Sequence, residues 1–166
     1  MDPARTPCAG ETGEEVEMNA GELCTREVVV AERELSVIEG AERMASHHVG
    51  DLVIAEERGT ELLPIGIVTD RDLVRFALAH GLDVIRRTRV VDAMSGELVT
   101  ARETDDVASV LKRMRGHGVR RMPIVNARGA LVGILTADDV LEWLSEQMED
   151  LVKLIAREQT REARGA

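Results

Sequence analysis

The sequence predicts a mixed α/β (α+β) fold in which two copies of a β-α-β-β-α unit pack sheet to sheet and a long helix follows at the C-terminal end. Two observations carry this prediction: the chain repeats itself, and the apolar pattern in each copy changes between helical and strand spacing in the same order. A third is composition, because 44% hydrophobic residues in 166 suits a globular protein. Aromatic residues are almost absent, so the core must be aliphatic.

The repeat is visible by direct comparison of the two halves. Residues 44–54 match residues 114–124 at an offset of 70, and residues 66–74 match residues 133–141 at an offset of 67. The difference of three residues falls in the predicted loop 57–64, where a change of length costs little free energy. One structural unit is therefore used twice.

The first copy is expected at residues 18–83, after an acidic leader at 1–17 that is too polar and Gly-rich to fold. Its pattern predicts a helix near 35–46, strands near 51–54 and 65–68, and a helix over 70–80. Gly81 suits the end of that last helix. A linker at 84–89 follows, and its cluster Arg86, Arg87 and Arg89 is interpreted as solvated rather than as a nucleic-acid contact.

The second copy is expected at residues 90–145. Val107, Val110, Leu111 and Met114 mark one face of a helix, for which Thr104 is the predicted N-cap. Strands at 122–125 and 130–135 flank a turn, which predicts a hairpin, and a helix begins just after it. Each copy has about 60 residues, a size at which an isolated core is marginal, so the two are expected to pack sheet to sheet.

The extension at 146–166 continues the last helix. Leu141, Leu144, Met148, Leu151 and Ile155 alternate spacings of three and four, which gives the helix one apolar stripe. Such a stripe serves as core within the chain or as the seam of a homodimer. Its extension well beyond the repeat favours the seam.

Charge and cysteine content limit the classes of function. The chain has 21 Lys plus Arg against 31 Asp plus Glu, and its net charge of −10 opposes binding to nucleic acid or to an anionic membrane. It has no apolar run of about 20 residues and no signal-peptide pattern, so we expect a cytoplasmic protein. Cys8 and Cys24 cannot form a disulfide framework and are expected as thiols.

The most specific motif reads Gly, apolar, any, Thr or Ser, any, any, Asp, and it occurs in register at residues 66–72 and 133–139. Over roughly residues 21–144 the chain thereby resembles the CBS-domain family, whose members carry such repeats in pairs. The resemblance implies a flat, pseudo-symmetric module that binds AMP, ADP or ATP, or in some members another adenosyl ligand such as S-adenosylmethionine or NAD(H).

The chemistry of the motif agrees with this implication. An Asp in the first helical turn can accept hydrogen bonds from both ribose hydroxyls, which suits Asp72 and Asp139. A Thr beside the free N–H groups of a helix start can bind phosphate, which suits Thr69 and Thr136. Both residue types also cap helices without any ligand, and this alternative stays open.

The resemblance implies two clefts shared between the copies. The first would combine Ile134, Thr136, Asp139, Arg120, Arg121, Val29 and Val49. The second would combine Ile67, Thr69, Asp72, Gly50, Asp51, Val99 and Val119. A carboxylate near a phosphate is unfavourable and two arginines are favourable, so charge favours the first cleft. Asp138 beside the first cleft and Arg71 within the second reduce this difference.

The resulting prediction is a non-catalytic regulatory module that signals occupancy by an adenine nucleotide to an unknown effector protein. It needs no cofactor, and Mg²⁺ would enter only with ATP. The sequence contains no paired nucleophile and base, no Walker-type loop and no metal set; His47, His48 and His117 are interpreted as exposed helix-end residues. The alternatives are a dimerisation module with empty clefts or a binder of another adenosyl ligand.

Overall fold

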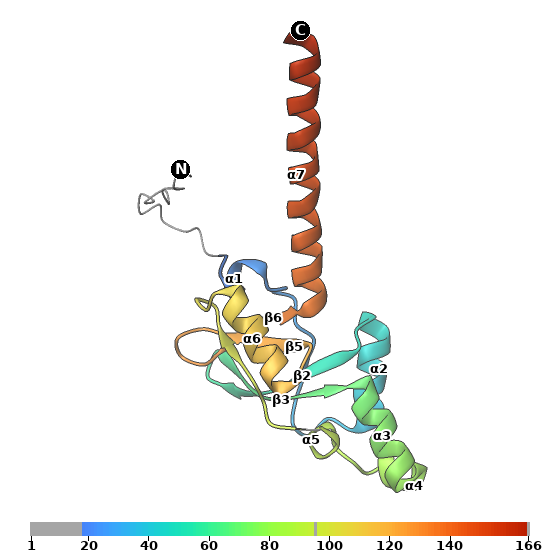
Figure 1. The fold of residues 1–166 in the computed structure, drawn as a ribbon. Coiled ribbons are helices and arrows are strands. Elements are labelled where there is room, and N and C mark those ends of the chain that lie inside the picture. Colours follow the sequence, from blue (N-terminus) through green and yellow to red (C-terminus); the bar gives the residue numbers. More distant parts are fainter. Residues whose placement is uncertain (1–17, 95, 166) are drawn as a thin grey trace, which may run out of the picture.

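The computed structural model describes residues 18–94 and 96–165, and its elements follow the predicted order twice (Figure 1). The first copy contains α1 (Ala20–Leu23), β1 (Val30–Ala31), α2 (Val37–His47), β2 (Asp51–Arg58), β3 (Glu61–Thr69), α3 (Asp70–His80) and the short α4 (Leu82–Ile85). The second contains α5 (Val90–Ala93), β4 (Ala101–Arg102), α6 (Val107–His117), β5 (Arg121–Val125), β6 (Leu131–Thr136) and α7 (Ala137–Gly165). The predicted leader lies outside the described residues.

Each copy forms one three-stranded sheet, in the order β1-β2-β3 or β4-β5-β6. The first pair of strands in each sheet is parallel and the second is an antiparallel hairpin. The sheets meet at β3 and β6. The predicted architecture of two equivalent α/β units with a long C-terminal helix is confirmed.

The two hairpins differ in length, and this accounts for the change of offset in the repeat. Strands β2 and β3 extend beyond their predicted ends and run together from Asp51–Thr69 to Arg58–Glu61, with Gly59 at a φ of +67° in the turn. The extra residues therefore lengthen a hairpin instead of a loop. In the second copy, Asn126 closes the shorter turn by accepting hydrogen bonds from two backbone N–H groups.

The short helix that begins each copy packs on the sheet of the other copy. Thr25, which follows α1, pairs with Ile134 of β6: the backbone N–H of each residue donates a 2.9 Å hydrogen bond to the carbonyl of the other. Helix α5 contacts β3, and Val90 N–H donates to the Leu35 carbonyl over 2.8 Å. Because each copy completes the other's core, the two fold as one body.

The predicted linker 84–89 takes part in this packing. Thr88 is buried, and its carbonyl accepts a 2.9 Å hydrogen bond from the N–H of Val37. The Arg86, Arg87 and Arg89 side chains are exposed, as the solvated interpretation expects. The segment is thus anchored through its backbone while its charges face solvent.

The core consists of two aliphatic clusters, one for each sheet. Ala20 and Cys24 from α1 and its C-terminal cap join the cluster of the second sheet, and Val90 and Ala93 from α5 join that of the first. One predicted cap was wrong: α6 begins after Asp106, whose side chain accepts a 2.9 Å bond from the Ser109 N–H. That bond lowers the pKa of Asp106.

Helix α7 contacts the body only at its start. Val140 is buried, whereas all five residues of the predicted apolar stripe are exposed along a helix that extends away from both sheets (Figure 1). The stripe beyond Val140 is therefore not core within this chain.

Candidate functional site

Both predicted Thr–Asp pairs lie where a strand becomes a helix, and both cap that helix. The Thr69 hydroxyl accepts a 3.2 Å bond from the Asp72 N–H, and the Asp72 carboxylate accepts bonds from the Thr69 N–H at 3.0 Å and its hydroxyl at 2.6 Å. Thr136 and Asp139 repeat the backbone bonds at 2.7 and 3.1 Å. Both pairs therefore cap their helices, and these bonds hold each carboxylate in a fixed orientation.

The glycine that opens each motif is required by packing. A Cβ on Gly66 would lie 2.3 Å from the Met94 sulfur, and one on Gly133 would lie 2.5 Å from the Cys24 sulfur and 2.9 Å from the Thr25 carbonyl oxygen. Met94 is the C-terminal cap of α5 and lies directly against Gly66 of β3, and Cys24 is the C-terminal cap of α1 and lies directly against Gly133 of β6. Cys24 is buried, and burial raises the pKa of its thiol, with Arg26 partly opposing. Cys24 therefore serves as a small core residue.

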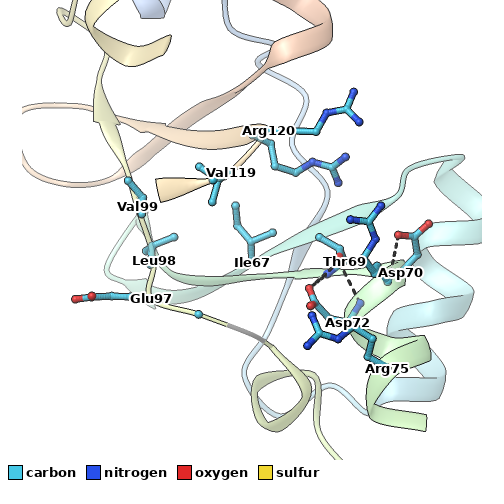
Figure 2. Close-up of a pocket in the computed structure, with 14 residues that line it drawn as sticks. Ile67, Thr69, Asp70, Asp72, Arg75, Glu97, Leu98, Val99, Val119 and Arg120 are labelled. Atoms are coloured by element: carbon cyan, nitrogen blue, oxygen red, sulfur yellow. Dashed lines mark hydrogen bonds between the residues drawn. The ribbon is translucent and has the colours of Figure 1, made fainter. Parts of the chain in front are cut away.

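A pocket of about 390 Å³ opens between the β3–α3 turn of the first copy and the second copy (Figure 2). Such a volume suits a small ligand. Its walls are Ile67, Thr69, Asp70, Arg71, Asp72 and Arg75 from the first copy, and Gly96, Glu97, Leu98, Val99, Gly118, Val119, Arg120 and Arg121 from the second. Figure 2 shows the apolar side chains gathered at one end and the charged helix start at the other.

This pocket contains most of the second predicted cleft, namely Ile67, Thr69, Asp72, Val99 and Val119. Arg120 and Arg121, which were predicted to group with the motif of their own copy, also line this pocket. The helix-to-strand turn of the second copy thus lies opposite the strand-to-helix turn of the first. The arginine side chains of that turn therefore lie beside the first copy's motif.

The residues predicted at that turn in the first copy, Gly50 and Asp51, lie beside the pocket wall. The Asp51 carboxylate accepts a 2.5 Å bond from Arg121 and forms an ion pair that joins the two copies. Burial raises the pKa of Asp51, Arg121 partly opposes this, and Asp70 adds to it. Desolvation of this carboxylate thus outweighs its attraction to Arg121.

Residues of the first predicted cleft are divided between a hollow and the second motif beside it, and Thr25 joins the two through its backbone bonds to Ile134. Val29 and Val49 line a separate, more open hollow together with Thr25, Glu27, Val28, Val30, Arg43 and His47. Among the described residues, Ile134, Thr136 and Asp139 stand outside the walls of that hollow. Arg120 and Arg121 line the pocket and also lie next to the second motif, since Arg121 pairs in register with Thr136 and the exposed Arg120 side chain pairs with Asp138 over 3.2 Å.

Several wall residues were not predicted. Arg75 lies one turn after Arg71 on the same face of α3, and this spacing of four was a usable signal. Asp70, Glu97 and Leu98 had no comparable signal, because their place depends on how the copies dock. The pocket walls carry four arginines and three carboxylates, and two of the arginines, Arg120 and Arg121, pair with Asp138 and Asp51 beside the pocket.

Within 18–94 and 96–165, the His, Cys, Asp and Glu side chains form no group of three suited to a metal ion. None of the helices described there combines the length and the apolar character needed to cross a bilayer.

The doubled α/β unit, with its exchanged short helices and the pocket between the copies, defines a class of paired modules. The chain belongs to the CBS domain family, whose sequence pattern matches residues 20–79 and 90–146, and it is a tandem CBS pair. An uncharacterised protein of Methanopyrus kandleri is 34% identical over 147 residues, covering 85% of this chain and 71% of that protein.

Two solved structures share the fold. A CBS domain protein from Pyrobaculum aerophilum complexed with AMP is 29% identical with a TM-score of 0.64, covering 74% of this chain and 89% of that one. The cytosolic domain of the Mg²⁺ channel MgtE in complex with ATP is 29% identical with a TM-score of 0.62, covering 76% and 48%. MgtE of Thermus thermophilus is also similar in sequence, at 33% identity over 145 residues.

Proposed function

We propose that this chain is a non-catalytic regulatory module that binds an adenine nucleotide in the pocket containing Thr69 and Asp72. The observation that carries the proposal is that the Thr–Asp helix start of one copy faces apolar side chains and two arginines of the other. The AMP and ATP complexes of the similar structures support this choice of ligand.

Each part of the nucleotide has a chemically suitable wall. The ribose hydroxyls would donate to the Asp72 carboxylate, which the cap already orients. The phosphates would lie among the α3 N-terminus and the arginines at 71, 75, 120 and 121. The adenine would lie against Ile67, Val99 and Val119, where apolar contact is available.

The equivalent site at Thr136 and Asp139 is proposed as the weaker one. This reverses the preference expected from the sequence, because the arginines that determined it line the other pocket. The equivalents of Arg120 and Arg121 on this side are Gly50 and Asp51, which supply no positive charge. Arg120 could still approach it through its contact with Asp138.

Binding would be transmitted through the Arg121–Asp51 ion pair. A phosphate that attracts Arg121 competes with Asp51, so occupancy alters a contact between the copies. A ligand shifts a conformational equilibrium only when it binds one state better, and this competition provides such a difference. The effector that responds is a separate protein, and the nucleotide is a regulatory ligand, with Mg²⁺ entering only alongside ATP.

Thermal unfolding with AMP, ADP, ATP, NADH and S-adenosylmethionine tests the proposal on the wild type and on two matched variants. We expect an adenine nucleotide to raise the melting temperature, Asp72→Ala to abolish the rise, and Asp139→Ala to retain most of it. Both variants remove one helix cap, so their intrinsic stability loss is comparable. No rise with any ligand would instead favour a dimerisation module with empty clefts, and nucleotide turnover would indicate an enzyme.

A further inference from the structure

Helix α7 carries an apolar face that nothing in the described chain covers. Seven of its side chains are between 43% and 67% exposed: Leu141, Leu144, Met148, Leu151, Val152, Leu154 and Ile155. They leave on the order of 700 Å² of apolar surface on one helix, which is more than a monomer usually exposes in one patch. A standard protein–protein interface buries a similar area, about 800 Å², on each partner. The face has the size of one half of a specific contact.

The spacing of these residues suits a second helix. Leu141, Leu144, Met148, Leu151 and Ile155 occupy successive a and d positions, which form the seam of a coiled coil. Val152 and Leu154 lie beside the seam and widen it at its middle. Because α7 extends away from both sheets, a partner helix can approach this face along most of its length (Figure 1).

Charge along α7 decides the direction of the partner. Residues 138–150 contain six carboxylates and no Lys or Arg, whereas residues 151–165 contain Lys153, Arg157, Arg161 and Arg164 against two carboxylates. Two parallel copies would place the acidic halves side by side, within a Debye length of about 8–10 Å. Two antiparallel copies would place each acidic half beside a basic half.

We infer that α7 pairs with α7 of a second copy of this chain in the antiparallel direction. The a and d layers then match when Leu144 of one copy lies opposite Ile155 of the other and Met148 lies opposite Leu151. In this register the segment 142–150 of one copy faces 149–157 of the other, which contains Lys153 and Arg157. The two CBS pairs stand at opposite ends of the helix pair.

Disulfide trapping in the full chain tests both the partner and the direction. In a background with Cys8→Ser and Cys24→Ala, Leu144→Cys and Ile155→Cys are made separately, then oxidised alone and as a mixture. Positions 144 and 155 are about 16 Å apart along a helix, so the two directions give different products. The antiparallel pair yields the mixed disulfide and little dimer from either variant alone.

Efficient disulfide formation by Leu144→Cys alone would show a parallel pair and overturn the inference. Light scattering provides the second readout: the wild type should be a dimer, and Leu151→Asp should become a monomer while retaining its helical circular dichroism. The matched control is Glu146→Ala, on the opposite face of α7, which should remain a dimer. A monomeric wild type, or a Leu151→Asp variant that stays dimeric, would overturn the inference.

Discussion

Replacement of Asp51 by Asn tests the electrostatics of the proposed pocket most specifically. Asp51 is 17% exposed and pairs with Arg121, whose side chain is 30% exposed. A phosphate held by Arg121 would lie about 7 Å from this carboxylate, and two unit charges at that separation repel by about 2 kcal/mol at an effective dielectric near 20. Solvent screening reduces this to about 1 kcal/mol. Asp51→Asn should therefore bind the nucleotide about fivefold more tightly.

The same substitution should cost little stability, because burial already disfavours the charged form of Asp51. Its pKa is raised above the ordinary value of 3.8. Compared with the unfolded chain, the folded chain thus binds this proton more tightly. The contribution of Asp51 to stability is therefore present below pH 3.8 and is lost as the pH rises through its folded pKa. We expect the unfolding free energy of Asp51→Asn to lie within about 1 kcal/mol of the wild type at pH 7, or above it.

The matched control removes the other partner of the ion pair. Arg121→Ala leaves the Asp51 carboxylate without its cation and should lower the unfolding free energy by about 2 kcal/mol at pH 7, with partial recovery towards pH 4. It should also weaken nucleotide binding. The assays are isothermal titration calorimetry and urea unfolding, and a Kd for Asp51→Asn equal to or weaker than that of the wild type would refute the electrostatic reasoning.

Two further predictions concern packing and charge. Gly133→Ala should lower the free energy of unfolding in urea by about 3 kcal/mol, because the added methyl meets the fixed Thr25 carbonyl. Gly66→Ala should lower it by about 1 kcal/mol, because the methyl meets the flexible Met94 side chain. Equal losses in the two variants would argue against this explanation of the motif glycines. Arg75→Ala should weaken ATP binding about tenfold and AMP binding less, as longer phosphate chains reach further along α3, and calorimetry showing the same loss for both would count against it.

The repeat made most of the fold predictable from the sequence. The order of elements follows from apolar periodicity, and α3 begins and ends where its Thr69 cap and Gly81 indicate. The exchange of α1 and α5 between the copies was not predictable, because four-residue helices have no periodic signal of their own. The close approach that makes Gly66 and Gly133 necessary depends on that exchange.

The sequence identified the residues of the candidate site more accurately than it predicted which of them lie together. Thr69 and Asp72 were expected together, and they lie together with Val99 and Val119 of the other copy. Arg120 and Arg121 were grouped with the motif of their own copy because the family resemblance implied that grouping. Only the docking of the two sheets shows that their side chains reach across to the first copy.

The most direct measurement is the structure of this chain bound to an adenine nucleotide. We expect the ribose at the Asp72 carboxylate, the phosphates among Arg71, Arg75 and the two arginines of the second copy, and Arg121 drawn away from Asp51. A nucleotide held by Thr136 and Asp139 with the Arg121–Asp51 pair intact would contradict this expectation.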